Sequence, residues 1–233
     1  MQVALTLLLA GIAALDAAPV AQTLLSQPLV TATLLGVIWG DMRVALEVGV
    51  ILQLLAASTL PVGSRTPEDY AVGGVVGAAV ALALASREVF SMVKESCALL
   101  GVFAGLISAT AGVPLLKWQR RSNEGLARWC EEAIRGGSSA ALGQAQAAGV
   151  VLAFAVGVSW CALCLGLGVW LLGPIAAHQS LRLSRAWLLA QPLWLGLGIA
   201  QLLNGFVQRR LTRAAVFGFA LVTAWLVLMV GSR

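Results

Sequence analysis

The sequence has little charge for its length. Only 11% of its 233 residues are Asp, Glu, Lys or Arg, whereas 60% are apolar. An average soluble domain is about 25% charged. So little polar surface could not cover so apolar a chain in water, which argues against an ordinary soluble domain. We therefore expect lipid to surround most of the protein.

Side chains suited to metal or redox chemistry are also scarce. His178 is the single histidine, and there are four cysteines. Cys161 and Cys164 form a C-x-x-C pattern, but they lie in the apolar run 150–170 with no His or carboxylate nearby. Free cysteine packs as a small hydrophobe, so we interpret this pair as packing. No metal or cofactor is expected.

The basic residues are confined to loops between apolar runs. The net charge of +5 therefore indicates topology, and no nucleic-acid partner is expected. At ~20 residues per crossing, the length allows about six to eight spans. We predict an all-α, polytopic integral membrane protein with one membrane-embedded domain over residues 1–233. Residues 3–21 begin without a preceding Lys or Arg and are interpreted as the first membrane helix, not a cleaved signal.

The run 28–60 is apolar but too long for one crossing. It contains Gly40 and Gly49, and Asp41, Arg43 and Glu47 interrupt it. Interrupted segments are tolerated in membranes where they are buried in protein or line a cavity. Transporters use them to build binding sites. The sequence therefore predicts two half-length helices, broken or re-entrant, that meet near Gly40–Asp41.

The remaining runs predict further helices. Residues 70–86 form a helix of small side chains, and residues 117–146 form an amphipathic helix on the membrane surface. Spans are expected at 97–116, 147–172, 187–206 and 214–230. The positive-inside rule places 117–135 and 209–213 in the cytoplasm and the loop 174–186, with His178, outside. The orientation of the N-terminus is left open.

Polar residues inside apolar runs are functional candidates, because burying them is costly. Each also has a structural alternative. Asp41 is interpreted as a cap or a ligand, Glu47 as an ion-pair partner of Arg43, and Gln53 as an interhelical hydrogen bond or a ligand. Glu68, beside Asp69, is a helix cap or a site residue. Asp16 and Gln22 remain open in the same way.

The order of these residues resembles the N-terminal half of IIC subunits in the mannose/fructose/sorbose family of phosphotransferase systems. The matching elements are Asp16, Gln22, Ser26-Gln27-Pro28-Leu29, Gly40-Asp41, Gly49-x-x-Leu52-Gln53, Gly63 and Pro67-Glu68. Fainter matches follow at 123–141, at Gly198-x-Ala200-x-x-x-Asn204 and at Phe217-Gly218-Phe219. The chain departs from the family at Gln27, where Arg is usual, and at Ala45, Glu47 and Glu68.

The resemblance implies a sugar-translocating subunit in the inner membrane of a bacterium. Such a subunit pairs with a IID membrane subunit, and the small-residue helix 70–86 is predicted to offer the surface for that partner. Cytoplasmic IIB phosphorylates the hexose-type sugar with phosphate received from IIA. No phosphorylated residue is expected on this chain, and homo-oligomerisation is left open. Six residues are predicted to converge on one polar cavity that binds the sugar: Asp16, Gln22, Asp41, Gln53, Glu68 and Asn204.

Three other interpretations remain. An unrelated secondary transporter also uses broken helices, and the same acids could bind a coupling ion. An intramembrane aspartyl protease would use Asp16 and Asp41, but such proteases show Gly-x-Gly-Asp where this chain has Ile38-Trp39-Gly40-Asp41. A regulatory or sensing relic of an incomplete phosphotransferase system is the third.

Overall fold

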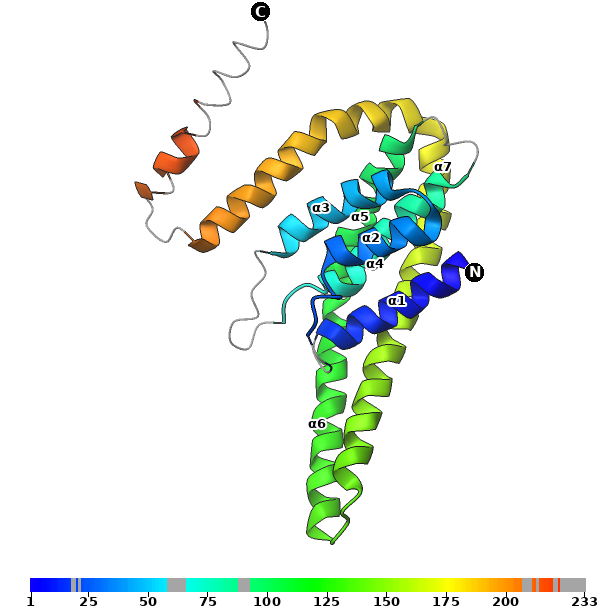
Figure 1. The fold of residues 1–233 in the computed structure, drawn as a ribbon, viewed down its shortest axis with the longest axis vertical. Coiled ribbons are helices and arrows are strands. Elements are labelled where there is room, and N and C mark those ends of the chain that lie inside the picture. The colour runs from blue at the N-terminus through cyan, green and yellow to red at the C-terminus, as the bar shows by residue number, and fades with distance from the viewer. Residues whose placement is uncertain are drawn as a thin grey trace, which may run out of the picture.

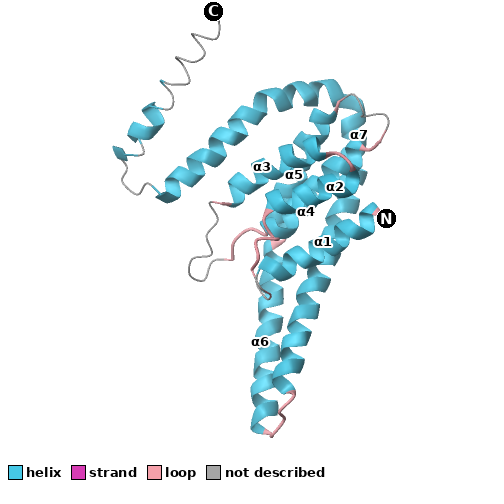
Figure 2. Ribbon diagram, viewed as in Figure 1, coloured by secondary structure: helices cyan, strands magenta, loops and turns pink. Residues whose placement is uncertain are grey.

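The described part of the chain is built from helices joined by loops (Figure 2). A computed structural model describes residues 1–17, 20, 22–57, 66–87, 93–206, 211–212, 214–219 and 222. The helices are α1 Gln2–Ala17, α2 Pro28–Trp39, α3 Met42–Ala56, α4 Tyr70–Ala85, α5 Lys94–Ala111, α6 Val113–Arg135 and α7 Ala141–Phe206. The prediction of an all-α fold with a broken N-terminal segment is therefore confirmed. Of the expected span 214–230, only residues 214–219 and 222 are described, and Arg209, Arg210 and Arg213 lie outside the described residues.

The break near Gly40–Asp41 falls where the sequence predicts it. Gly40 closes α2 with φ 78°, a left-handed conformation that glycine adopts without a steric cost. Asp41 then caps α3 by accepting a hydrogen bond from Val44 N at 3.2 Å. At ~1.5 Å per residue, α2 is about 18 Å long and α3 about 22 Å. Both are shorter than the ~30 Å hydrocarbon core of a bilayer.

α2 and α3 pair as an antiparallel hairpin. Gly49 packs against Ala32 and the carbonyl of Pro28, while Gly36 packs against Ala45. The tip of this hairpin is therefore Gly40–Asp41, and its base holds the first residues of α2 and the last of α3. Because the base and the tip lie at opposite ends, polar residues close in sequence are separated in space.

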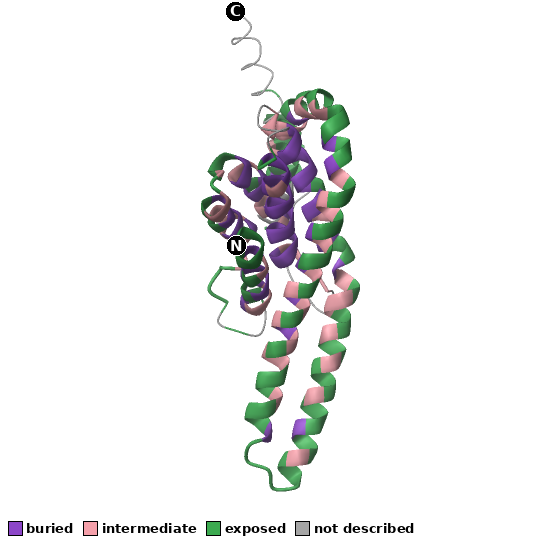
Figure 3. Cartoon of the chain, turned by 90° about the vertical axis from the view of Figure 1, so that its right-hand side faces the viewer, coloured by how far each residue is buried: buried purple, intermediate pink, exposed green. Residues whose placement is uncertain are grey.

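α4 is the centre of the protein. It contacts α1, α2, α3, α5 and α7, and fourteen of its sixteen residues are buried. The buried colour in Figure 3 is concentrated in this part of the molecule. Its small residues therefore pack inside the chain. They do not form the surface for a partner subunit that the sequence suggests.

The closest packing joins α4 to α5. A side chain at Gly77 would lie 2.9 Å from the Gly101 carbonyl oxygen, and one at Gly101 would lie 2.6 Å from that of Gly77. Gly73, Gly77 and Ala81 on α4 face Gly101, Gly105 and Ala109 on α5. Small residues at a spacing of four let membrane helices approach this closely.

α6 packs against α7. It continues almost in line with α5 and runs beside the first turns of α7, forming a helical hairpin that projects from the core (Figure 1). Cys130 and Ala141 are buried at this contact. The predicted single helix 117–146 is divided, because α6 ends at Arg135 and α7 begins at Ala141. Its location on the membrane surface stays a prediction.

The prediction that residues 174–186 form a loop is wrong. These residues are helical, and α7 bends at Gln179, whose φ and ψ are −125° and 20°. The bend follows Pro174, which has no backbone N–H and therefore removes one hydrogen bond from the helix. α7 therefore consists of a first arm before Gln179 and a second arm after it, and the second arm turns back toward the core (Figure 1). Trp194 of the second arm contacts Phe103 of α5, with ring centroids 5.9 Å apart.

Among the described residues, two helical stretches are long and apolar enough to cross a membrane. They are Lys94–Arg135, which joins α5 and α6, and Ala141–Ala200 of α7. α1, α2 and α4 are shorter apolar helices. Length and composition thus agree with the membrane environment expected from the sequence.

Candidate functional site

A cavity of about 580 Å³ lies where α2 and α4 begin. α1, the end of α3, α6 and the first arm of α7 form the rest of its wall. Its polar and aromatic lining residues are Ser26, Gln27, Glu68, Asp69, Tyr70, Gln119, Arg120, Asn123 and Trp160. Small-molecule sites usually enclose about 300–1,000 Å³ with a few placed polar groups, and this cavity fits that description.

Asp16 fixes the loop that leads into α2. One carboxylate oxygen accepts from the backbone N and the hydroxyl of Thr23, the latter at 2.7 Å, and the other accepts from Ser26 N at 2.8 Å. Gly74 of α4 then allows close approach, because a side chain there would lie 2.9 Å from the Pro28 Cα. These contacts hold Ser26 and Gln27 at the cavity wall.

The segment before α4 is fixed from three directions. Asp69 accepts from Val72 N at 3.2 Å and caps the helix, as carboxylates do at helix starts. The Asp69 backbone N donates to the Ala109 carbonyl of α5 at 3.0 Å. Arg120 of α6 donates to the Thr66 hydroxyl at 3.2 Å. Glu68, next to the cap, lies in the cavity wall.

Trp160 forms the wall on the α7 side. Its indole Nε1 donates to the Ser108 carbonyl of α5 at 3.2 Å, so the ring is held in one orientation. Tyr70, the first residue of α4, lines the same cavity. Two aromatic rings thus accompany the polar groups.

Gln53 lies at the base of the α2–α3 hairpin. Its Oε1 accepts from Leu29 N at 3.3 Å, and its Nε2 donates to Gln27 Oε1 at 2.6 Å. Leu29 is in the first turn of α2, where the backbone donors have no partner within the helix. Gln53 therefore caps α2 from α3, which is the interhelical hydrogen bond anticipated as its structural role.

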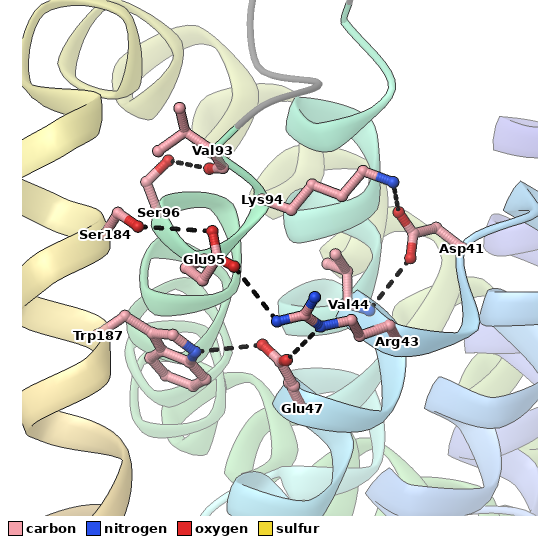
Figure 4. Close-up of polar contacts among 10 residues, drawn as sticks. All are labelled: Asp41, Arg43, Val44, Glu47, Val93, Lys94, Glu95, Ser96, Ser184 and Trp187. Carbon is pink, nitrogen blue, oxygen red and sulfur yellow. Dashed lines mark hydrogen bonds and ion pairs between the residues drawn. The ribbon is translucent and has the colours of Figure 1, made fainter.

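Asp41 lies at the opposite end of α3. Its second oxygen forms an ion pair with Lys94 of α5 at 2.6 Å (Figure 4). Gln53 lies twelve positions further along the chain, which is about 18 Å along the helix axis. One cavity of the observed size at the hairpin base therefore does not include Asp41.

The same end holds a wider polar network. Arg43 pairs with Glu47 at 3.0 Å, as the sequence suggests, and also with Glu95 of α5 at 3.2 Å. The buried Trp187 donates its Nε1 to Glu47 at 3.1 Å, and Ser184 donates to Glu95 at 3.5 Å (Figure 4). This network joins the hairpin tip and α5 to the second arm of α7.

The six predicted site residues therefore separate into groups. Glu68 lines the cavity, while Asp16 and Gln53 hold residues that line it. Gln22 is exposed in the loop after α1 with φ 51°, and Asp41 lies at the hairpin tip. Asn204 falls in the last turn of α7, and its side chain lies outside the described residues.

Sequence reasoning missed several lining residues. Gln27 stands inside the Ser-Gln-Pro-Leu element but is interpreted there only as a departure from the usual Arg. Tyr70 directly follows Asp69, so its position beside the helix cap was a usable signal. Asn123 and Trp160 come from distant helices, and no local pattern indicates that they meet α2 and α4.

The cavity wall is suited to a ligand with several hydroxyl groups. Carboxylate oxygens accept hydrogen bonds, amides both accept and donate, and aromatic rings cover apolar faces. The described residues contain no group of three or more His, Cys, Asp or Glu side chains that could hold a metal ion. The arrangement offers hydrogen-bond acceptors, donors and aromatic faces to a sugar-sized molecule.

Comparison with known proteins agrees with these features. The chain matches, over residues 1–232, the family described as the PTS system sorbose-specific IIC component. No curated protein sequence matches the chain.

Two solved structures share the fold. One, described as "Structure of membrane protein", has a TM-score of 0.69 at 19% identity, covering 99% of this chain and 93% of that one. The other is a chain of the "CryoEM Structure of Mannose Transporter ManYZ and Microcin E492 (MceA) complex", with a TM-score of 0.56 at 16% identity, covering 97% of this chain and 94% of that one. The broken hairpin, the cavity at its base and the match over nearly the whole length lead to one conclusion: the chain belongs to the sorbose-specific IIC family of the phosphotransferase system.

Proposed function

We propose that this chain is the sugar-translocating subunit of a bacterial phosphotransferase complex, crossing the inner membrane several times. It binds an uncharged hexose-type sugar in the cavity at the base of the α2–α3 hairpin. The observation that carries the proposal is the cavity itself, about 580 Å³ in volume, with amide, carboxylate and aromatic side chains in its wall.

The position of the cavity suits delivery toward the cytoplasm. Gln119, Arg120 and Asn123 of its wall belong to α6. This helix carries five of the fifteen Lys and Arg residues and is expected in the cytoplasm by the positive-inside rule. A IIB subunit on that side would phosphorylate the sugar as it leaves, with phosphate from IIA. This chain contributes binding and release, and the phosphoryl group is carried by its partners.

A IID membrane subunit would contact a surface other than α4. The second arm of α7 offers one, because large apolar side chains along it are exposed: Leu188, Leu189, Leu193, Leu197 and Ile199. Such a face requires lipid or another membrane helix. We propose that the IID subunit covers part of it.

Glu68→Gln tests the proposal. The change keeps the size of the side chain and removes the carboxylate from the cavity wall, so the Kd for the transported sugar should rise about tenfold, as for loss of a charged hydrogen bond. Binding of mannose and sorbose to the full chain, reconstituted with its IID subunit, measures this by titration calorimetry. Glu124→Gln on the exposed face of α6 is the matched control.

Two results would contradict the proposal. The unaltered complex could bind neither sugar, nor fructose, at millimolar concentration. Alternatively, Glu68→Gln could leave both binding and phosphorylation-coupled uptake at the level of the Glu124→Gln control.

A further inference from the structure

The side-chain amide of Gln27 has a defined orientation. A backbone N–H only donates, so the atom of Gln53 that faces Leu29 N, at 3.3 Å, is its oxygen. The Gln53 nitrogen therefore faces Gln27 and donates to its oxygen at 2.6 Å. The remaining end of the Gln27 amide is its NH2 group, which carries two donors.

Gln27 is the member of this pair that reaches the cavity. It lines the wall beside Ser26 and Pro28, whereas Gln53 is not among the described lining residues. The Gln27 side chain makes no capping bond at the start of α2, because Gln53 already fills that role for Leu29. Its donors are therefore not required by the helix.

We propose that Gln27 donates a hydrogen bond to the sugar and that Gln53 is a positioning residue that holds Gln27 with its NH2 group toward the cavity. This inference rests on the proposed function, since it assigns a specificity-determining residue to the same site. The amide is uncharged, so it recognises a hydroxyl or ring oxygen of a neutral sugar and gives no compensation for burying a sugar phosphate or a uronate.

Two changes at Gln27 isolate the donors. Gln27→Glu keeps the acceptor for Gln53 and removes both N–H groups. Gln27→Met removes the N–H groups without adding charge, but it also removes the oxygen that accepts from Gln53, so Gln27→Glu is the variant that separates the two effects. Both should raise the Kd for mannose or sorbose about tenfold. The melting temperature should fall only slightly, because the change lies at a cavity wall. Gln144→Glu on α7, outside the cavity wall, is the control for an added carboxylate.

Gln53→Glu tests the positioning role. The new carboxylate still accepts from Leu29 N, so the α2 cap survives, but it no longer donates to Gln27. The Gln27 amide should then turn its NH2 group toward the carboxylate and present oxygen to the cavity. We expect the Kd for the sugar to rise about as much as in the Gln27 variants, with an unchanged melting temperature. Gln53→Leu, in contrast, should also lower the melting temperature, because it removes the cap.

A series of deoxy sugars identifies the contact. Mannose lacking the hydroxyl that Gln27 reaches should bind equally to the unaltered chain and to Gln27→Met, while the other deoxy analogues should retain the difference. Normal binding by Gln27→Met, or an equal loss with every analogue, would overturn the assignment of Gln27 and leave the proposed function standing. Failure of the unaltered complex to bind any of the sugars would overturn the proposed function instead.

Discussion

Asp16 shows how a candidate ligand in the sequence serves as support in the structure. It is 5% exposed, and its two oxygens accept from Thr23 and Ser26. Both carboxylate oxygens of Asp16 therefore accept hydrogen bonds from the loop that contains Gln27. Its effect on a bound sugar would therefore be indirect, through the loop conformation.

Asp16→Asn should destabilise the protein. The new NH2 group must face at least one backbone donor, which leaves a buried donor without an acceptor at a cost of about 1–3 kcal/mol. We expect the melting temperature of the purified protein to fall by several degrees, together with weaker sugar binding. Thermal unfolding followed by tryptophan fluorescence measures the change.

Glu131→Gln, an exposed position on α6, serves as the comparison for Asp16→Asn. If Asp16→Asn abolished binding while the melting temperature stayed at the level of Glu131→Gln, Asp16 would be a direct ligand. The support role would then be wrong.

At the scale of elements, the α4–α5 crossing determines whether the core can form. The helices meet through Gly77 and Gly101, and either Cβ atom would approach the opposite backbone closer than van der Waals contact allows. Since α4 is surrounded by five other helices, any separation from α5 is transmitted to α2 and hence to the cavity wall.

Gly101→Ala should therefore lower stability, although alanine is the better helix former. Its Cβ would lie 2.6 Å from both the Gly77 oxygen and the Ala81 Cβ, and overpacking of this kind costs about 1–3 kcal/mol. Gly125→Ala is the matched control, because nothing lies within 4 Å of the added atom and the helix should gain up to about 1 kcal/mol. Thermal melts should move in opposite directions for the two variants, and parallel shifts would contradict the packing account.

The sequence predicts some elements better than others, for local reasons. The break at Gly40–Asp41 is predictable because a left-handed glycine and a helix cap are adjacent within a run too long for one crossing. The continuity of α7 is not, since Pro174, His178, Arg182 and Arg185 are typical of a loop. In the structure these residues are part of α7, which bends at Gln179.

At the scale of the whole molecule, the prediction of a single converging site fails for Asp41 because of the direction of the hairpin. In the sequence Asp41 lies between Gln22 and Gln53. Because α2 and α3 pair antiparallel, however, Asp41 lies at the tip of the hairpin, where it forms an ion pair with Lys94. Glu68 lines the cavity because it precedes a helix that starts at the hairpin base. Trp160 comes from a helix far along the chain, and only the tertiary arrangement brings it to the cavity that Tyr70 also lines.

The orientation of the molecule is predicted from its charge. Lys117, Arg120, Arg121, Arg128 and Arg135 lie on α6. Arg182 and Arg185 follow the bend of α7, and Arg43 and Lys94 at the same end form ion pairs with Glu47, Glu95 and Asp41. By the positive-inside rule we expect the projecting α6–α7 hairpin to lie in the cytoplasm. The tip network around Glu47 and Trp187, at the other end of the core, would then face the outside.

Cysteine labelling tests this orientation in intact cells. Ser138 lies in the exposed turn between α6 and α7, and Gln179 is exposed at the α7 bend. In a chain whose four natural cysteines are replaced by alanine or serine, a membrane-impermeant maleimide should label Gln179→Cys from outside. Ser138→Cys should react only after the membrane is opened or inverted, because the charged hairpin would otherwise have to be translocated. Equal labelling of both sites, or labelling of Ser138→Cys alone, would reverse the orientation and place the cavity mouth away from IIB.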